Sequence, residues 1–212
     1  RDAAWRVLPR ARLAAGDSAG AGRAWVAARA GGSPARRGEA AAEAGKLALA
    51  RGDSAGARRL LLEGLEVGRG PAQARAAASL LSFRDTDLAS TLRMAAALDG
   101  VNDRGPALRA YDRAERIARE SGASLPDSAR LSRARLMSTV VTRQAEALEE
   151  FRALRAGTRD SGVGALNLEL WARLRERQGR GRDAETVRGW LLEEYPGSAQ
   201  AAEVMWARAE EA

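Results

Sequence analysis

Apolar positions recur along this chain at the three- and four-residue spacing of one helix face, and short polar breaks containing glycine separate the stretches. The apolar residues are mainly alanine and leucine, which favour helices. The segment 13–21 reads Leu-Ala-Ala-Gly-Asp-Ser-Ala-Gly-Ala and returns almost unchanged at 49–57, an offset of 36 residues. Its Gly-Asp-Ser supplies a helix stop and then an N-cap. Each copy therefore predicts a helix, a tight turn and a second helix.

The same join recurs less regularly further along the chain. An alanine opens each predicted second helix: Ala21, Ala57, Ala107, Ala147 and Ala184. Successive alanines are 36, 50, 40 and 37 residues apart, a spacing typical of stacked helical hairpins. Residues 71–86 account for the long interval, and we expect them to form one extra short helix or a bend in the stack. The pattern predicts an all-α fold.

These units resemble the tetratricopeptide repeat, a 34-residue helical hairpin. That repeat has Trp and Leu early in its first helix, a small residue opening the second, an aromatic four residues later and a closing proline. The matching residues of the first unit are Trp5, Leu8, Ala21, Trp25 and Pro34. The third unit has Ala107 and Tyr111, and the fourth has Ala147 and Phe151. The fifth unit has Trp171, Gly179, Ala184 and Pro196. The second unit has Leu61 where an aromatic is usual.

The resemblance implies a single repeat domain over residues 1–212, built as a right-handed α-solenoid of antiparallel helix hairpins. The expected parts are units 2–35, 38–70, 88–124, 127–160 and 163–197, the irregular stretch 71–86 and a closing helix 198–212. The closing helix looks like the start of a sixth unit, as either a capping helix or a truncation. The chain begins at Arg1 without an initiator methionine, so we expect a processed chain or a fragment.

The repeat positions of the tryptophans favour packing between helices over a binding platform. We expect Trp5 to contact Trp25, and Trp171 to contact Trp190. In the family, the first helices line a concave face. Carried over to this chain, the inward positions are Arg6, Arg10, Glu39, Lys46, Ser132, Thr139, Glu169, Arg173 and Glu176. Our candidate partner-binding residues are Arg6, Arg10, Lys46, Glu169 and Arg173.

Charge is distributed unevenly along the chain. In total, 35 basic residues face 28 acidic ones, and Lys46 is the single lysine. Residues 1–84 have a net charge of +8 and residues 85–212 a net charge of −1. The first end of the concave face is therefore expected to be basic, which would attract an anionic partner. A solvated surface without any partner is the alternative interpretation of the same charge.

The residue types exclude several kinds of chemistry. The chain has no histidine and no cysteine, which rules out disulfides, thiolate and imidazole catalysis, and metal sites built from these ligands. The neighbouring pairs Glu149–Glu150 and Glu193–Glu194 would point about 100° apart on a helix, so they indicate surface charge. We expect no catalysis, cofactor or metal within residues 1–212. No apolar run is long enough to span a bilayer.

We therefore expect a non-catalytic scaffold for protein–protein interaction or for assembly of a larger complex. The closing run from Tyr195 to Trp206 resembles repeats of bacterial cell-envelope proteins, including the superhelical region of soluble lytic transglycosylases. An alternative is therefore the N-terminal arm of such an enzyme, with peptidoglycan as ligand and the catalytic domain outside this chain. The resemblance implies a periplasmic or cell-envelope location, and a cytoplasmic location is the alternative.

A second alternative is an RNA-binding helical repeat. Such proteins read one base per repeat through repeated polar positions. The corresponding positions here are occupied by Ala, Arg, Glu and Leu without a consistent code. The sequence therefore favours a protein partner over nucleic acid.

Overall fold

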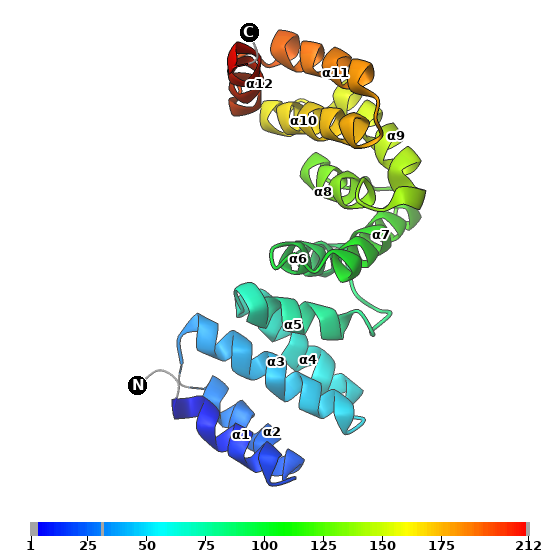
Figure 1. Cartoon of the computed structure of the whole chain (residues 1–212). Helices are drawn as coiled ribbons and strands as arrows, with labels where there is room; N and C mark the ends of the chain where they lie inside the picture. The colour runs from blue at the N-terminus through cyan, green and yellow to red at the C-terminus, as the bar shows by residue number, and fades with distance from the viewer. Residues whose placement is uncertain (1–3, 31, 211–212) are drawn as a thin grey trace. The chain divides into compact units, whose positions relative to one another are not determined.

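The computed structural model describes residues 4–30 and 32–210. Every regular element in these two ranges is a helix, which confirms the predicted all-α fold (Figure 1). The helices group into two compact units, unit 1 (Arg1–Gly122) and unit 2 (Ala123–Ala212). A single repeat domain with a right-handed superhelix stays a prediction. Residues 2–3 and 31 of the first predicted repeat, and 211–212 of the closing helix, lie outside the described residues.

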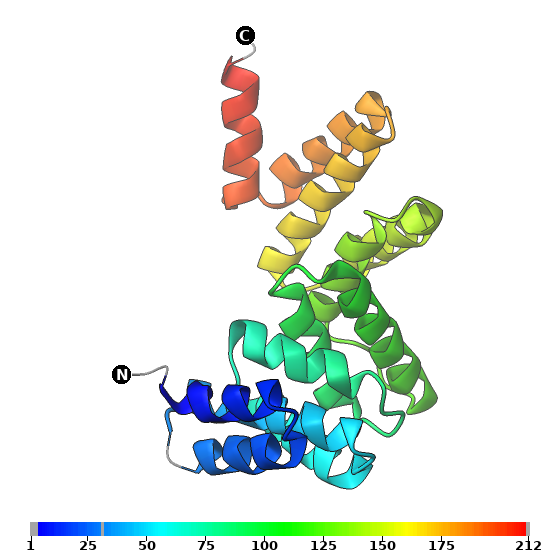
Figure 2. The same ribbon diagram turned by 60° about the horizontal axis from the view of Figure 1, so that its bottom comes forward.

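Helical hairpins and one single helix make up the described part of unit 1. A 3-10 turn, Ala4–Arg6, leads into the first hairpin, whose two helices lie side by side in both views (Figures 1 and 2). The hairpins are α1 (Val7–Ala14) with α2 (Ser18–Arg29), α3 (Pro34–Ala50) with α4 (Ser54–Val67), and α6 (Leu88–Asp99) with α7 (Arg104–Glu120). The single helix, α5 (Gly70–Leu80), forms in the irregular stretch and packs against α3, α4 and α6.

Unit 2 continues the same construction. Its hairpins are α8 (Asp127–Met137) with α9 (Gln144–Gly157), joined through a 3-10 turn at Val141–Arg143, and α10 (Ser161–Arg177) with α11 (Gly181–Glu194). The last helix, α12 (Ala199–Glu210), packs against α10 and α11. None of the helices in the described ranges is long and apolar enough to cross a membrane.

The repeated Gly-Asp-Ser join works as its residue types predict. Gly16 and Gly52 adopt left-handed backbone angles, with φ of +79° and +80°, which end the preceding helices at little steric cost. The carboxylates of Asp17 and Asp53 then accept hydrogen bonds from the amides of Gly20 and Gly56 at 2.7 and 2.8 Å. Each aspartate therefore caps the second helix of its hairpin.

The alanine that opens each second helix lies at the centre of its hairpin. Ala21, Ala57, Ala107, Ala147 and Ala184 are all fully buried. Small side chains at these positions let two helix backbones approach closely, and a large neighbour one turn later fills the remaining space. That neighbour is also buried in the first four hairpins: Trp25, Leu61, Tyr111 and Phe151.

Both predicted tryptophan contacts are confirmed. The rings of Trp5 and Trp25 meet edge to face with centroids 5.6 Å apart. Trp171 and Trp190 meet at a tilt with centroids 5.5 Å apart. Offset and edge-on pairs at these distances are favourable beyond the area they bury. The tryptophans thus pack against one another between neighbouring segments of a hairpin, as their repeat positions indicated.

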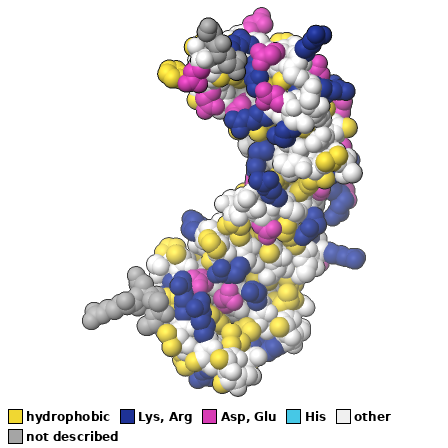
Figure 3. Space-filling model, viewed as in Figure 1, with side chains coloured by type: hydrophobic (Ala, Val, Ile, Leu, Met, Phe, Trp, Pro, Cys, Tyr) yellow, Lys and Arg dark blue, Asp and Glu magenta, His cyan; other side chains and the backbone are white. Residues whose placement is uncertain are grey.

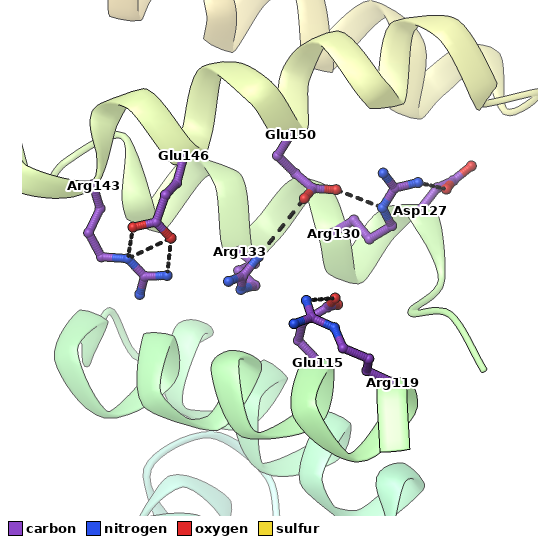
Figure 4. Close-up of polar contacts among 8 residues, drawn as sticks. All are labelled: Glu115, Arg119, Asp127, Arg130, Arg133, Arg143, Glu146 and Glu150. Atoms are coloured by element: carbon purple, nitrogen blue, oxygen red, sulfur yellow. Dashed lines mark hydrogen bonds and ion pairs between the residues drawn. The ribbon is translucent and has the colours of Figure 1, made fainter. Parts of the chain in front are cut away.

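An ion-pair network joins the two helices of the first hairpin of unit 2 (Figure 4). The carboxylate of Glu150, on α9, lies 2.6 Å from Arg130 Nε and 3.9 Å from Arg133 Nη1, both on α8. Arg130 also lies 3.2 Å from Asp127 at the start of its own helix. Because these side chains are mostly shielded, the pairs hold the hairpin more firmly than fully exposed pairs would.

Candidate partner-binding grooves

Unit 1 has a groove of about 580 Å³ where α1, α3 and α5 face the same side. Figure 3 shows basic and acidic side chains intermingled over these helices. The lining residues, which we call the unit 1 groove, are Arg6, Arg10, Leu13, Trp25, Ala35, Glu39, Glu43, Arg69, Pro71, Ala72 and Arg75. Four arginines and two glutamates line it, which gives a net charge of +2.

The two glutamates neutralise part of this positive charge. Glu39 is paired with Arg6 and lies 4.0 Å from Arg75 Nη2. Glu43 lies 3.0 Å from Arg75 Nε and 3.7 Å from Lys46 Nζ. Two of the predicted binding residues, Arg6 and Lys46, are therefore already engaged in ion pairs within the unit.

The remaining two arginines of the groove keep their charge available. Arg10 is exposed and makes no ion pair with the described residues. Arg69 donates hydrogen bonds only to backbone carbonyls, those of Gly68 at 2.7 Å and Glu66 at 3.4 Å. Both guanidiniums can therefore engage an anionic group without breaking an ion pair.

Aromatic side chains lie behind the charged wall of the groove. Trp25 lines it although only 2% of the residue is exposed, and its indole Nε1 has no hydrogen-bond acceptor among the described residues. The guanidiniums of Arg6 and Arg36 lie 5.0 and 5.3 Å from the centre of the Trp5 ring. These cation–π contacts hold Arg6 in place beside Glu39.

Unit 2 has a smaller groove, of about 260 Å³, between α10, α11 and α12. Six of its seven charged side chains pair with one another: Glu169 with Arg173, Glu176 with Arg188, and Glu185 with both Arg188 and Arg208. Glu203 makes no ion pair with the described residues. Hydrogen bonds from Arg188, and then from Arg208, lower the pKa of the Glu185 carboxyl. Four glutamates and three arginines line the unit 2 groove, which gives it a net charge of −1, whereas the unit 1 groove has a net charge of +2.

The structure divides the predicted binding residues between the two units. Arg6 and Arg10 line the unit 1 groove, with Lys46 beside it through Glu43, and Glu169 and Arg173 line the unit 2 groove. That any of these five contacts a partner stays a prediction. Thr139 does not occupy a concave helical position, because α8 already ends at Met137 and the Thr139 hydroxyl donates to the Leu136 carbonyl at 2.7 Å.

Three charged residues of the unit 1 groove were not predicted from the sequence: Glu43, Arg69 and Arg75. The arginines come from α5 and the residue before it, in the stretch that fits no repeat. A helix start was readable there, because Pro71 follows Gly70 and proline favours the first turn of a helix. The spacing of the repeats could not show that this helix turns toward the same side as α1 and α3.

Within the described ranges, no cluster of three or more acidic side chains is placed to hold a metal ion. Both carboxylates of the unit 1 groove, and three of the four in the unit 2 groove, are paired with arginine or lysine side chains. Both grooves present charged side chains in a concave surface, an arrangement suited to binding a ligand.

Comparison with known proteins leaves the family open. No protein-family model matches the chain, and no curated protein does. Among solved structures, a crystal structure of MamA is similar with 15% sequence identity, covering 88% of this chain and 93% of that one, at a TM-score of 0.43. So loose a likeness carries no functional information, and the fold assignment rests on the helices themselves.

Proposed function

We propose that this chain is a non-catalytic helical-repeat scaffold of the tetratricopeptide type, and that the unit 1 groove binds an acidic segment of a protein partner. One observation carries the proposal: Arg10 and Arg69 line a groove formed between several helices and make no ion pair with the described residues. An acidic side chain entering there gains charge-assisted hydrogen bonds without displacing an internal carboxylate.

The shape of the groove supports an extended ligand. Four helices contribute to it, and a peptide crossing the groove meets Arg10 of α1, Ala35 of α3 and Ala72 of α5. The small side chains leave room for the ligand's backbone, while the arginines select its charge. Binding should weaken with added salt, because the exposed guanidiniums are screened.

Fluorescence polarisation tests the charge preference. The probe is a labelled peptide with glutamate at alternate positions, compared with its glutamine counterpart. Removing one charge-assisted contact and adding repulsion in Arg10→Glu should weaken binding of the glutamate peptide by about tenfold or more in low salt. Arg23→Glu is the matched control, because Arg23 is an exposed arginine of unit 1 outside the groove. Equal losses in both variants, or equal binding of both peptides, would refute the groove as the site.

A photo-crosslinking side chain tests the scaffold function in the native cell. Placed at Ala35, inside the groove, the crosslinker should capture a partner peptide, and this capture should be lost when Arg10→Glu is also introduced. Placed at Ala27, an exposed residue of α2 outside the groove, it should capture none. Identical products from both positions would show that the groove is not the binding surface. Fractionation of the same cells tests the cell-envelope location that the tail sequence suggests.

A further inference from the structure

A second charged hollow lies on α7, apart from the unit 1 groove. It has a volume of about 760 Å³ and is lined by Arg84, Arg109, Asp112, Arg113 and Arg116. Three of these arginines stand at positions i, i+4 and i+7 of α7, which places them on one face of the helix. Arg84 reaches the same hollow from the loop that joins α5 to α6. Four arginines and one aspartate give this arginine hollow a net charge of +3.

The loop is fixed to the helices by two arginines, which holds Arg84 in position. Arg113 donates from Nη2 to the carbonyl of Arg84, and Arg58 of α4 donates to the carbonyl of Asp85. Both bonds connect residues far apart in sequence, so they close the loop onto the body of unit 1. The backbone that carries Arg84 is therefore in place before any ligand arrives, which lowers the part of the entropic cost of binding that comes from the loop.

The positive charge in the hollow is only partly balanced within the protein. Arg84 and Arg109 make no ion pair with the described residues. Arg116 lies 3.2 Å from Glu120, but this pair is exposed and contributes little. Burial and the neighbouring charge of Arg116 lower the pKa of the Arg113 guanidinium. Asp85 offsets part of the repulsion between Arg113 and Arg116, and an anion bound among the arginines would relieve the rest.

We propose that the arginine hollow binds a phosphoryl group. A phosphoryl group carries up to two negative charges and presents three acceptor oxygens, whereas a carboxylate carries one negative charge and presents two acceptor oxygens. Several guanidiniums converging on one compact site therefore match the phosphoryl group better. Arginine is also the side chain whose planar donors fit phosphate oxygens two at a time.

The arginine hollow differs from the unit 1 groove in form, so the two proposals are independent. The groove runs across residues of α1, α2, α3 and α5 and suits an extended chain. The hollow is made by one helix and one loop and suits a compact group. Loss of peptide binding in the groove would leave the hollow unaffected, and the reverse holds as well.

Isothermal titration of the full chain with inorganic pyrophosphate tests the proposal. The variant Arg84→Gln with Arg109→Gln removes two lining guanidiniums that make no ion pair, and it leaves the loop bond of Arg113 in place. We expect the variant to bind pyrophosphate about tenfold more weakly or worse at low salt. The matched control is Arg119→Gln, an exposed arginine of the same helix paired with Glu115 outside the hollow (Figure 4). It should change the affinity by less than about twofold.

Three results would overturn the proposal: unchanged affinity in the double variant, an equal loss in Arg119→Gln, or succinate binding as tightly as pyrophosphate. Circular dichroism of each variant confirms that unit 1 remains folded. Vesicles of phosphatidylcholine with phosphatidic acid form a second arm that identifies the source of the phosphoryl group. Vesicle binding that pyrophosphate competes away assigns a lipid headgroup. Pyrophosphate binding without vesicle binding assigns a soluble phosphate.

Discussion

Replacing one buried amide should make the stability of unit 2 strongly dependent on pH. Asn167, on α10, is fully buried and donates from Nδ2 to the carbonyl of Phe151, on α9, at 2.9 Å. Its Oδ1 has no hydrogen-bond partner among the described residues. The substitution Asn167→Asp keeps the size of the side chain but places a carboxylate oxygen against the Phe151 carbonyl oxygen. At neutral pH this buries a negative charge beside a second acceptor.

The expected cost follows from the pKa of the new carboxyl. Burial favours its neutral form, and fully buried carboxyls have a pKa raised by about 3–5, which corresponds to about 4–7 kcal/mol at 1.4 kcal/mol for each pH unit. A small domain is stable by about 5–15 kcal/mol, so a loss of this size unfolds much of unit 2 at neutral pH. Below the ordinary pKa of aspartate, about 3.9, the neutral carboxyl can donate to Phe151 again.

The sign of the pH dependence is therefore fixed. A group whose pKa is raised in the folded state binds more protons there than in the unfolded state, so stability falls as pH rises. Urea denaturation followed by circular dichroism, from pH 4 to pH 8, gives the difference between Asn167→Asp and the parent at each pH. Asn167→Ala is the control, with a loss of about 1–2 kcal/mol at every pH. A flat difference for Asn167→Asp, or one below about 1 kcal/mol at pH 7, would refute the reasoning.

The remaining predictions concern unit 1. Gly38→Ala should destabilise unit 1 by about 1–3 kcal/mol in urea denaturation, because the new Cβ would lie 2.3 Å from Gly68 Cα. This steric cost exceeds the gain in helix propensity, which is roughly 1 kcal/mol. A stabilised variant would contradict the close approach of α3 to the end of α4. Glu39→Gln frees Arg6 and Arg75 from a carboxylate, and it should tighten binding of the acidic peptide about fivefold in fluorescence polarisation; weaker binding would show that Glu39 holds these arginines in their binding geometry. Asp87→Ala should cost about 1 kcal/mol at pH 6, measured by urea denaturation, through loss of the cap of α6. A backbone hydrogen bond from Ser90 lowers the pKa of Asp87, so this cap contributes above the ordinary pKa and is lost as pH falls through the lower folded value; a difference that persists in strong acid would point to another cause.

Much of the fold was predictable because its signals are local. Gly16 and Asp17 specify the first turn by themselves, one through its backbone angle and the other through its side-chain cap. The contact of Trp5 with Trp25 followed from their places within one hairpin. The orientation of α5 was not predictable, because its alanine-rich sequence matches no other repeat that would indicate which side it faces.

The candidate sites were predictable only in part, because charge balance depends on residues distant in sequence. The position of Arg6 in its unit indicated the inward face, but Glu39, which neutralises it, comes from the next hairpin. Arg69 enters the unit 1 groove only because α5 packs against α3 and α4. The arginine hollow needs the folded loop at 81–87, whose attachment to Arg58 and Arg113 has no signature in the sequence.

The single helix α5 can accept substitutions that the helices of the hairpins cannot. The two helices of a hairpin must vary together, since each buries its small residues against the other, whereas α5 packs against α3, α4 and α6 without belonging to a hairpin. Its outward residues, Arg69 and Arg75, nevertheless form one wall of the unit 1 groove. Substitutions in this segment can therefore retune which ligand is accepted while every hairpin keeps its packing, so we expect α5 to diverge fastest among descendants with different partners.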